Sequence, residues 1–256
     1  MREDRTALEE TARALAAASA VAALTGAGIS AESGVPTFRG PEGLWRNFRA
    51  EDLATPEAFA RDPALVWEWY RWRRVRMATV SPNPGHVALA RLESDLAAFT
   101  LITQNVDGLH ARAGSRHLLE LHGNIWRDRC TNHPAHRFSE DQTRELERQA
   151  EAGALPRCNC GELLRPDIVW FGEALDSNHI EAAVEVVRSA DILLVVGTSS
   201  VVYPAAALPG MARRAGARVV EINPEETPLS READVVLRGP AGVILPDLVR
   251  LIDKRR

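Results

Sequence analysis

The feature that most constrains this chain of 256 residues is a repeated alternation of short apolar runs with segments of helical spacing. The runs are aliphatic and β-branched with few polar interruptions, which is typical of strands buried on both faces. Segments such as 180–189 and 204–215 have the spacing and composition of helices. The alternation predicts an α/β fold with a doubly wound, parallel sheet. The expected strands are 21–25, 99–103, 117–121, 168–171, 192–197, 219–223 and 235–237.

Two stretches interrupt this alternation. Residues 41–84 are rich in tryptophan and arginine, and their pattern predicts a helical insertion. Residues 124–165 hold all three cysteines and a polar helical segment at 139–151, which predicts a small separate module. The rest of the chain, at 1–40, 85–123 and 166–256, is expected to form the sheet domain.

Composition narrows the classes of function. Hydrophobic residues make up 45% and charged residues 26%, a balance typical of a globular protein with a sizeable core. A net charge of −4 argues against binding nucleic acid through a general positive surface. No apolar run reaches the roughly 20 residues of a membrane span. Three cysteines cannot form a disulfide framework, and the N-terminus has no apolar signal core, so we expect a cytoplasmic protein.

The first apolar run ends in Gly26-Ala27-Gly28-Ile29-Ser30-Ala31, which fits the G-x-G-x-x-G/A pattern of a Rossmann-like dinucleotide-binding turn. Small residues let backbone N–H groups approach a pyrophosphate at the N-terminus of the next helix, although the same residues also suit a plain tight turn. A dehydrogenase would end a second strand in an acidic residue about 20 positions later, and this chain does not. It has instead a loop at 32–40 with an aromatic–arginine pair, Phe38 and Arg39.

Polar side chains follow two further predicted strands. Gln104, Asn105 and Asp107 come after the run 99–103 and could bind ribose hydroxyls or a carboxamide. Taken alone, this sequence could equally cap the following helix. His122 and Gly123 follow the run 117–121; histidine titrates near neutral pH and suits general-base catalysis, although a lone histidine is more often structural. Because ligands bind at the carboxyl ends of parallel strands, these groups are expected to share one site.

In their order and spacing, these motifs resemble the sirtuins, NAD-dependent protein-lysine deacylases, and in particular their class III, desuccinylase-like bacterial type. The resemblance rests on Gly26-Ala27-Gly28-Ile29-Ser30, Gln104-Asn105-Val106-Asp107 and His122-Gly123. It continues through Val169-Trp170-Phe171-Gly172-Glu173, Gly197-Thr198-Ser199, Asn223-Pro224-Glu225 and Ala241-Gly242. Each motif alone is weak, but the ordered set covers essentially the whole chain and is very specific.

The resemblance implies a role for each matching position. The catalytic residues would be His122 and Asn105. A substrate protein or peptide would pair with the backbone of Val169, Phe171, Gly172 and Glu173, as an added strand does. NAD would contact a larger set of residues: Gly26, Ala27, Gly28, Phe38, Arg39, Trp45, Gln104, Asn105, Asp107, Gly197, Thr198, Ser199, Asn223, Pro224, Glu225 and Ala241.

The implied reaction consumes NAD. The carbonyl oxygen of an acyl-lysine would attack the ribose carbon that carries nicotinamide, and His122 would remove a proton from a ribose hydroxyl. The products would be free lysine, nicotinamide and 2'-O-acyl-ADP-ribose. General-base catalysis of this kind is typically worth about 10²- to 10⁴-fold in rate. Two other functions stay open on the sequence: transfer of a single ADP-ribosyl group to a side chain, and a catalytically silent NAD sensor.

The segment Trp67-Glu68-Trp69-Tyr70-Arg71-Trp72-Arg73-Arg74 bears on the acyl group. If it is helical, Tyr70 and Arg73 share a face at i and i+3. A phenol beside a guanidinium can hold a carboxylate. The pair matches the Tyr-x-x-Arg signature of sirtuins that remove succinyl, malonyl and glutaryl groups, which implies a preference for succinyl or malonyl over, or alongside, acetyl. The alternative is a plain deacetylase in which this helix only packs on a core.

The resemblance also implies a structural zinc, which sirtuins usually bind with two pairs of cysteines. Here the corresponding sequences are Cys130-Thr131-Asn132-His133 and Cys158-Asn159-Cys160, so one cysteine is missing and the second pair is unusually tight. Tetrahedral zinc accepts three cysteines and a histidine. The expected ligands are therefore Cys130, His133, Cys158 and Cys160, with His136 as an alternative to His133; the other reading is a module without metal.

Overall fold

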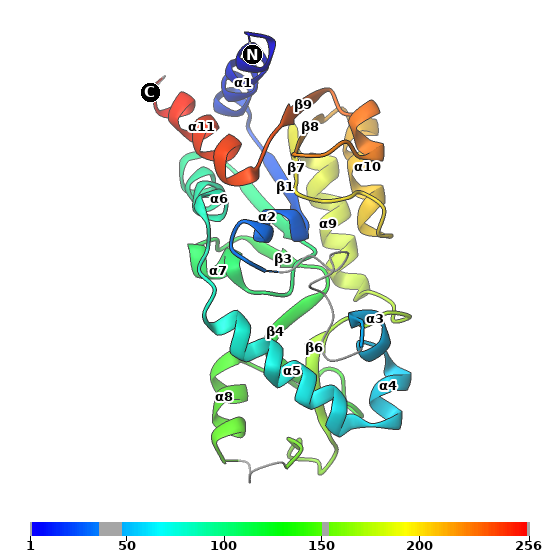
Figure 1. The fold of residues 1–256 in the computed structure, drawn as a ribbon. Helices are drawn as coiled ribbons and strands as arrows, with labels where there is room; N and C mark the ends of the chain where they lie inside the picture. The colour runs from blue at the N-terminus through cyan, green and yellow to red at the C-terminus, as the bar shows by residue number, and fades with distance from the viewer. Residues whose placement is uncertain (1, 36–47, 150–153, 255–256) are drawn as a thin grey trace.

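Within the part of the chain that the structure describes, the main sheet has six parallel strands in the order β3-β2-β1-β7-β8-β9 (Figure 1). The structure is a computed structural model and describes residues 2–35, 48–149 and 154–254. Each strand of this sheet overlaps its expected run, so the predicted parallel α/β fold is confirmed. The strands are β1 Val21–Thr25, β2 Phe99–Thr103, β3 Leu118–Glu120, β7 Ile192–Val196, β8 Arg218–Asn223 and β9 Val235–Arg238.

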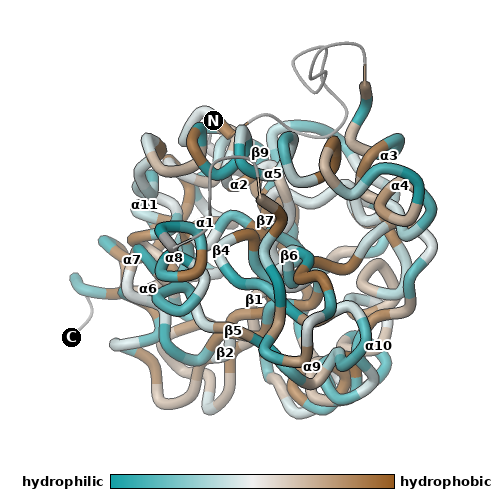
Figure 2. The backbone as a smooth tube through the Cα atoms, turned by 90° about the horizontal axis from the view of Figure 1, so that it is seen from below, coloured by the Kyte–Doolittle hydropathy of each residue, from teal (hydrophilic) through white to brown (hydrophobic). Residues whose placement is uncertain are grey.

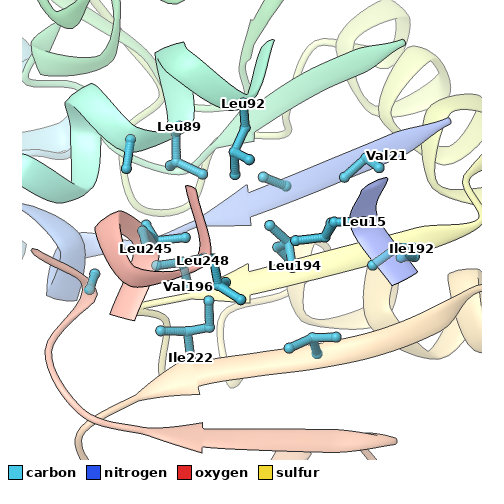
Figure 3. Packing of buried hydrophobic residues seen from close by; sticks show 14 of the residues in the cluster. Leu15, Val21, Leu89, Leu92, Ile192, Leu194, Val196, Ile222, Leu245 and Leu248 are labelled. Carbon is cyan, nitrogen blue, oxygen red and sulfur yellow. The ribbon is translucent and has the colours of Figure 1, made fainter. Parts of the chain in front are cut away.

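Helices cover both faces of this sheet (Figure 1). On one face, α1 (Arg2–Ala17), α6 (Pro84–Asp95) and α11 (Ala241–Asp253) pack their leucines against the strands. Figure 3 shows Leu15, Leu89 and Leu248 beside residues such as Leu194 of the sheet. The other face is covered by α9 (Ser177–Ser189) and α10 (Leu208–Arg214), preceded by the short 3-10 helix η2 (Ala205–Ala207). Burial on both faces explains why the strands are continuously apolar.

Shorter helices and turns connect these layers. Helix α2 (Ala27–Ala31) follows β1 directly, and α7 (Leu109–Ala113) follows the loop after β2. The 3-10 helix η3 (Pro228–Arg231) lies between β8 and β9. Among the described residues, no helix has the length and apolar composition needed to cross a membrane.

A second, antiparallel sheet has the order β5-β4-β6, formed by β4 (Gly123–Cys130), β5 (Arg137–Phe138) and β6 (Leu164–Ile168). The prediction of a parallel strand at 168–171 is wrong. The strand in this region, β6, ends at Ile168 and pairs antiparallel with β4. Its polar residues Arg165 and Asp167 are buried among opposite charges, with Arg165 in an ion pair to Glu173 at 2.5 Å. Such ion pairing lets a polar sequence form a buried strand, which the hydrophobic pattern does not reveal.

The helical insertion consists of α3 (Ala50–Leu53), α4 (Pro56–Arg61) and α5 (Pro63–Ala78). Proline at the first position and a capping side chain define two of the helix starts. Thr55 accepts from the backbone N–H of Ala58, and Asp62 accepts from that of Leu65. The described part of this stretch is thus helical, as its pattern predicts.

Helix α5 lies across the second sheet and shares one hydrophobic core with it (Figure 1). Trp67 donates its indole N–H to the carbonyl oxygen of Leu164 at 3.0 Å. Arg74 is buried in an ion pair with Asp128 of β4 at 2.6 Å and donates to the carbonyl oxygen of Ile125 at 2.7 Å. The polar helix α8 (Glu140–Gln149) packs beside β4, and Figure 2 colours it largely as hydrophilic. The insertion and the cysteine segment are therefore packed together, while the predicted domain bounds stay a prediction.

Candidate active site

The ends of β1 and β7 lie side by side at the middle of the main sheet, the place where a doubly wound sheet is expected to have its binding crevice. From β1 the chain continues to β2 and β3 on one side of the sheet, and from β7 to β8 and β9 on the other. Ligands of doubly wound sheets bind at such a switch point, outside the carboxyl ends of the strands. Most of the residues predicted for the site follow one of these strands, so the fold brings them to the same edge.

Glycines allow the backbone at the start of α2 to approach the end of β7 very closely. Gly28 donates its backbone N–H to the carbonyl oxygen of Gly197 at 2.7 Å. A Cβ atom on Gly28 would lie 2.7 Å from that same oxygen, and one on Gly197 would overlap the backbone of Ile29. Gly197 also has a φ of +58°, which favours glycine. The glycine motif is thus a close backbone contact between the start of α2 and the end of β7.

Amide side chains connect three strand ends in this crevice. Gln104, after β2, donates its side-chain N–H to the hydroxyl of Thr198 at 3.1 Å. Asn223, at the end of β8, donates to the carbonyl oxygen of Thr198 at 3.2 Å. Gln104 and Asn223 are only partly buried, so their side chains are accessible to a ligand at this edge of the sheet.

Beneath them lies a buried polar network. Asn105 donates to the hydroxyl of Ser30 at 3.2 Å and to the carbonyl oxygen of Gly26 at 3.0 Å. Ser30 donates in turn to the carboxylate of Asp107 at 2.7 Å. Burial raises the pKa of Asp107, although the N–H of Leu109 and the Ser30 hydroxyl act in the opposite direction. The network fixes the orientation of Asn105 and Asp107, two of the predicted site residues.

The sequence did not identify the full extent of this network. In the sequence, Ser30 is only part of the glycine motif, and no motif marks His86 as a site residue. His86 is fully buried with its Nε2 atom 3.3 Å from the Ser30 hydroxyl, and its Nδ1 atom accepts from the N–H of Asn83. Burial lowers the pKa of His86 to about 4, so the ring is neutral and donates through Nε2. Only the Pro84-Gly85-His86 start of α6 could have pointed to it.

His122 lies at the end of β3 with one ring nitrogen held by the backbone. Its Nδ1 atom lies 2.8 Å from the carbonyl oxygen of Gln104. A carbonyl oxygen only accepts, so Nδ1 carries the hydrogen and Nε2 keeps a lone pair. Burial lowers the pKa of His122, and the bond to Gln104 partly opposes this. The ring is therefore neutral at pH 7, as a general base must be.

Tyr70 and Arg73 lie one turn apart on α5, as predicted. Tyr70 is fully buried, and its hydroxyl oxygen accepts the indole N–H of Trp170 at 2.8 Å. The guanidinium of partly buried Arg73 lies 5.8 Å from the centre of the Tyr70 ring and 4.9 Å from that of Trp69. Burial raises the pKa of Tyr70 and lowers that of Arg73, and Arg73 is also attracted by Asp107. Arg73 thus connects the α5 helix electrostatically with the network under the crevice.

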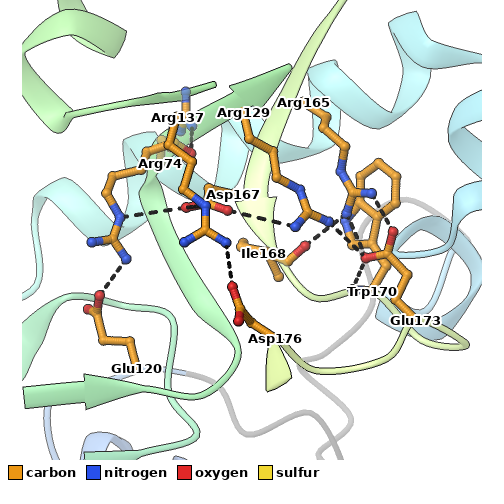
Figure 4. Close-up of polar contacts among 11 residues, drawn as sticks. Arg74, Glu120, Arg129, Arg137, Arg165, Asp167, Ile168, Trp170, Glu173 and Asp176 are labelled. Atoms are coloured by element: carbon orange, nitrogen blue, oxygen red, sulfur yellow. Dashed lines mark hydrogen bonds and ion pairs between the residues drawn. The ribbon is translucent and has the colours of Figure 1, made fainter. Parts of the chain in front are cut away.

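The segment 169–173 forms a turn that is fixed to its surroundings (Figure 4). Val169 donates its backbone N–H to the carbonyl oxygen of His122 at 2.9 Å, and Phe171 donates to that of Ala54 at 2.9 Å. The carboxylate of Glu173 accepts from the N–H of Trp170 at 2.8 Å and pairs with Arg165. Phe171 itself is about half exposed. Glu173 also donates its backbone N–H to the carbonyl oxygen of Trp170 at 3.0 Å, so four of the five N–H groups in the predicted peptide-binding segment 169–173 are used within the chain.

Three cysteine sulfurs meet at the far end of the second sheet. The sulfurs of Cys130, Cys158 and Cys160 lie within 4.8 Å of one another, and those of Cys130 and Cys160 are 3.6 Å apart. Backbone N–H groups of His133 and Asn132 donate to Cys130, whose pKa is lowered despite its burial. A tetrahedral zinc ion with bonds of about 2.3 Å would separate its sulfur ligands by roughly 3.8 Å, so the cluster fits this metal.

Both candidate histidines lie next to the cysteines, but their contacts differ. The Nδ1 atom of His136 is 3.9 Å from the sulfur of Cys158. The ring of His133 stacks on that of His136 with 5.1 Å between their centres. The backbone of His136 is fixed as well, because its carbonyl oxygen accepts the N–H of Cys130 at 3.0 Å.

The remaining predicted NAD contacts divide into two groups. Ser199, Pro224 and Glu225 follow β7 and β8, and Ala241 begins α11 beside Gly242, whose N–H donates to Glu32 at 2.9 Å. Ser199, Pro224 and Glu225 therefore lie at the carboxyl edge of the main sheet. Phe38, Arg39 and Trp45 lie outside the described residues.

Comparisons with known proteins agree with this geometry. A model of the Sir2 family matches residues 26–204. The NAD-dependent protein deacylase 2 of Pyrobaculum aerophilum is 55% identical over 90% of this chain and 90% of its own length. The NAD-dependent protein deacylase of Pyrococcus furiosus is 52% identical over 96% of this chain and 98% of its own length.

Solved structures are similar over the same span. A Sir2 homologue in complex with NAD has a TM-score of 0.88 and 46% identity, and the match covers 96% of this chain and 94% of that one. A complex of Sir2 with a p53 peptide and NAD+ has a TM-score of 0.80 and 32% identity, covering 96% of this chain and 97% of that one.

Proposed function

The chain belongs to the Sir2 family and is an NAD-dependent protein deacylase, and we propose that its acyl pocket selects lysines that carry an acidic acyl group. The single observation that carries this proposal is the Tyr70–Arg73 pair on α5, beside the network that contains Asp107. Succinyl-lysine and malonyl-lysine are the substrates that this pair favours over acetyl-lysine.

The residues at the crevice have complementary tasks in binding NAD. The glycines Gly26, Gly28 and Gly197 let the start of α2 lie against the end of β7, where the pyrophosphate would approach the backbone closely. Asn105 and Asp107, oriented by Ser30, hold the nicotinamide side. Ser199, Asn223, Glu225 and Ala241, on the side of β8, hold the adenosine. NAD supplies the activated ribose carbon to which the acyl oxygen becomes attached.

His122 acts as the general base of this reaction. Because Nδ1 is held by the carbonyl oxygen of Gln104, the Nε2 atom is the one that accepts the proton of a ribose hydroxyl. The hydrogen bond also prevents the ring from turning, so the base keeps its position during turnover. Asn105, anchored to Gly26 and Ser30, positions the reacting ribose.

The acyl pocket is selective because its two polar groups are donors. Burial keeps the Tyr70 phenol neutral, so its hydroxyl can donate to a carboxylate rather than repel it. Arg73 supplies positive charge and donors from the next turn of the helix. An acetyl group has no carboxylate and gains neither contact. Hydrogen bonds to charged groups contribute about 1.5–3 kcal/mol each, which corresponds to a preference of roughly 10- to 100-fold.

The substitution Arg73→Met tests this pocket because it keeps the length of the side chain and removes the charge. We expect kcat/KM for a succinyl-lysine peptide to fall about 10- to 100-fold, and that for the same peptide with acetyl-lysine to change less than about twofold. Arg76→Met is the matched control, since Arg76 is an exposed arginine on the same helix. Equal losses on both peptides would show that Arg73 has only a structural role.

The small module is suited to one structural zinc ion, and we propose Cys130, Cys158, Cys160 and His136 as its ligands. The sulfur separations fit tetrahedral coordination, and His136 Nδ1 faces Cys158. The sequence favoured His133, which occupies the position of the missing cysteine. The metal would stabilise the loops that end β4 and precede β6, far from the crevice.

Substrates of this enzyme are acyl-lysine peptides or proteins, in line with the solved complexes of Sir2 with a p53 peptide. A cytoplasmic location and the absence of a nucleic-acid partner are further proposals that rest on composition alone. Neither bears on the chemistry of the site.

A further inference from the structure

We infer that Trp170 is a specificity-positioning residue: its indole N–H occupies the acceptor side of the Tyr70 hydroxyl and so directs the hydroxyl hydrogen towards the carboxylate of the acyl group. This inference rests on the proposed acidic-acyl pocket and deepens it. It assigns to Trp170 a role separate from the peptide pairing expected of its neighbours Val169 and Phe171.

The contact between the two side chains is direct and buried. Trp170 is 3% exposed and Tyr70 is fully buried, and the indole nitrogen lies 2.8 Å from the phenol oxygen. An indole N–H can only donate, so Tyr70 must be the acceptor in this bond. The phenol has one hydrogen, and that hydrogen cannot point at the incoming N–H. It is therefore left for another acceptor, on the side away from Trp170.

The position of the indole is itself fixed by its neighbours. The guanidinium of Arg165 lies 3.2 Å from the centre of a Trp170 ring, and Phe59 packs 5.3 Å from it. Arg165 is held by Glu173 at 2.5 Å and by the carbonyl oxygen of Ile168 at 2.8 Å (Figure 4). Glu173 also accepts from the backbone N–H of Trp170. The turn after β6 thus keeps the indole aimed at Tyr70.

Without this donor, the Tyr70 hydroxyl could turn its hydrogen either way. A hydroxyl that is free to rotate loses part of its contribution to binding, because the donor must be ordered when the substrate enters. The effect should appear only for an acyl group that accepts from Tyr70. An acetyl group has no carboxylate, so its turnover should not depend on the direction of the hydroxyl.

The substitution Trp170→Phe tests this role by removing the N–H and keeping an aromatic ring. The matched control is Trp67→Phe: Trp67 is buried in the same core, and its indole N–H bonds to the carbonyl oxygen of Leu164 instead. We expect Trp170→Phe to lower kcat/KM for the succinyl peptide about 3- to 10-fold, as for one buried neutral hydrogen bond, with less than about a twofold change for the acetyl peptide. Trp67→Phe should leave the ratio of the two unchanged.

A double-mutant cycle with Tyr70→Phe separates direction of the hydroxyl from general packing. In the Tyr70→Phe background, Trp170→Phe should change the succinyl-to-acetyl ratio less than about twofold, because no hydroxyl remains to be directed. The chain has two tyrosines, so a protein labelled with ¹³C at Cζ of tyrosine gives two signals, and Tyr70→Phe assigns them. Trp170→Phe should move the Tyr70 signal, whereas Trp67→Phe should not.

The outcomes distinguish this inference from the proposal beneath it. If Arg73→Met spares the succinyl preference, the acidic-acyl pocket itself is wrong. If Arg73→Met removes that preference while Trp170→Phe affects both peptides equally, only the role of Trp170 is overturned. An effect of Trp170→Phe that persists in the Tyr70→Phe background would overturn it as well. If Trp170→Phe fails to fold, 3-benzothienylalanine at position 170 replaces it, because sulfur takes the place of the indole N–H and the ring size is kept; an unchanged Tyr70 signal there would overturn the role of Trp170.

Discussion

His122 shows how the backbone sets the chemistry of a single side chain. The carbonyl oxygen of Gln104 fixes which ring nitrogen carries the hydrogen, and burial keeps the ring neutral. The sequence predicted the residue but could not predict its tautomer, because Gln104 is 18 positions earlier and approaches only through the pairing of β2 with β3. The same holds for Ser30 and His86, whose contacts join α2, α6 and the loop after β2.

The pH dependence of turnover follows from this environment. A protonated imidazole cannot accept a proton, so activity is lost as pH falls through the pKa of His122. Burial lowers that pKa below its ordinary value of about 6.5, and the acid limb should therefore lie below pH 6.5. The measurement is kcat/KM for an acyl peptide between pH 5 and pH 8 at saturating NAD. A limb centred above about pH 7 would be inconsistent with a buried, neutral base.

Gly123 is a residue at which an added methyl group should strongly lower the stability of the fold. Its φ is +80°, and a Cβ atom would overlap the carbonyl oxygen of Asp167 in the paired strand. We expect Gly123→Ala to lower the free energy of unfolding by about 3 kcal/mol or more. Gly172→Ala is the control, because Gly172 has a similar φ of +85° with open space around it, and should cost about 1–2 kcal/mol. Urea unfolding measures both; equal losses would contradict the steric argument.

At the scale of elements, helix α5 combines two tasks. Trp67 and Arg74 attach it to the second sheet, while Tyr70 and Arg73, on an adjoining part of its surface, form the proposed acyl pocket. Helical spacing alone predicted that Tyr70 and Arg73 share a face. It could not predict that Tyr70 is bonded to Trp170, since that contact spans 100 positions and depends on the turn after β6.

The zinc ligands are also decided by how elements meet. Cys130 ends β4, and Cys158 and Cys160 lie in the turn before β6, so the antiparallel pairing of these strands brings the sulfurs together. With Co²⁺ as the probe, His136→Ala should lower metal affinity on the order of tenfold or more and alter the visible ligand-field bands. His133→Ala should leave both nearly unchanged. The reverse result would assign the fourth ligand to His133, and loss in neither variant would leave the site with three cysteines and a non-histidine ligand.

At the scale of the whole molecule, the way in which a strand is buried decided whether the sequence could predict it. Strands with apolar neighbours on both faces, such as β1 and β7, were found at their expected residues because no polar side chain interrupts them. Strand β6 was misplaced because Arg165 and Asp167 are buried through ion pairs that only the folded chain supplies. The site at the carboxyl ends of the parallel strands was predictable from topology, while the network beneath it required the packing of distant segments.

The arrangement of the two sheets explains how one molecule can join NAD chemistry to acyl selection. The chain passes from β3 through His122 directly into β4, so the base lies where the sheet domain meets the core that contains Tyr70. Arg73 is attracted by both Tyr70 and Asp107, which connects the acyl pocket with the nicotinamide side of the crevice. An acidic acyl group in this pocket would thus be bound next to the reacting ribose.

The most direct test of this account compares one peptide carrying succinyl-lysine or acetyl-lysine at the same position, with and without NAD, and follows both loss of the acyl group and release of nicotinamide. We predict NAD-dependent loss of both acyl groups, each matched by nicotinamide, with kcat/KM for succinyl-lysine higher by about 10-fold or more. A preference for acetyl-lysine would keep the deacylase and reject the acidic-acyl pocket. Nicotinamide release without loss of either acyl group would contradict the central claim and point to ADP-ribosyl transfer.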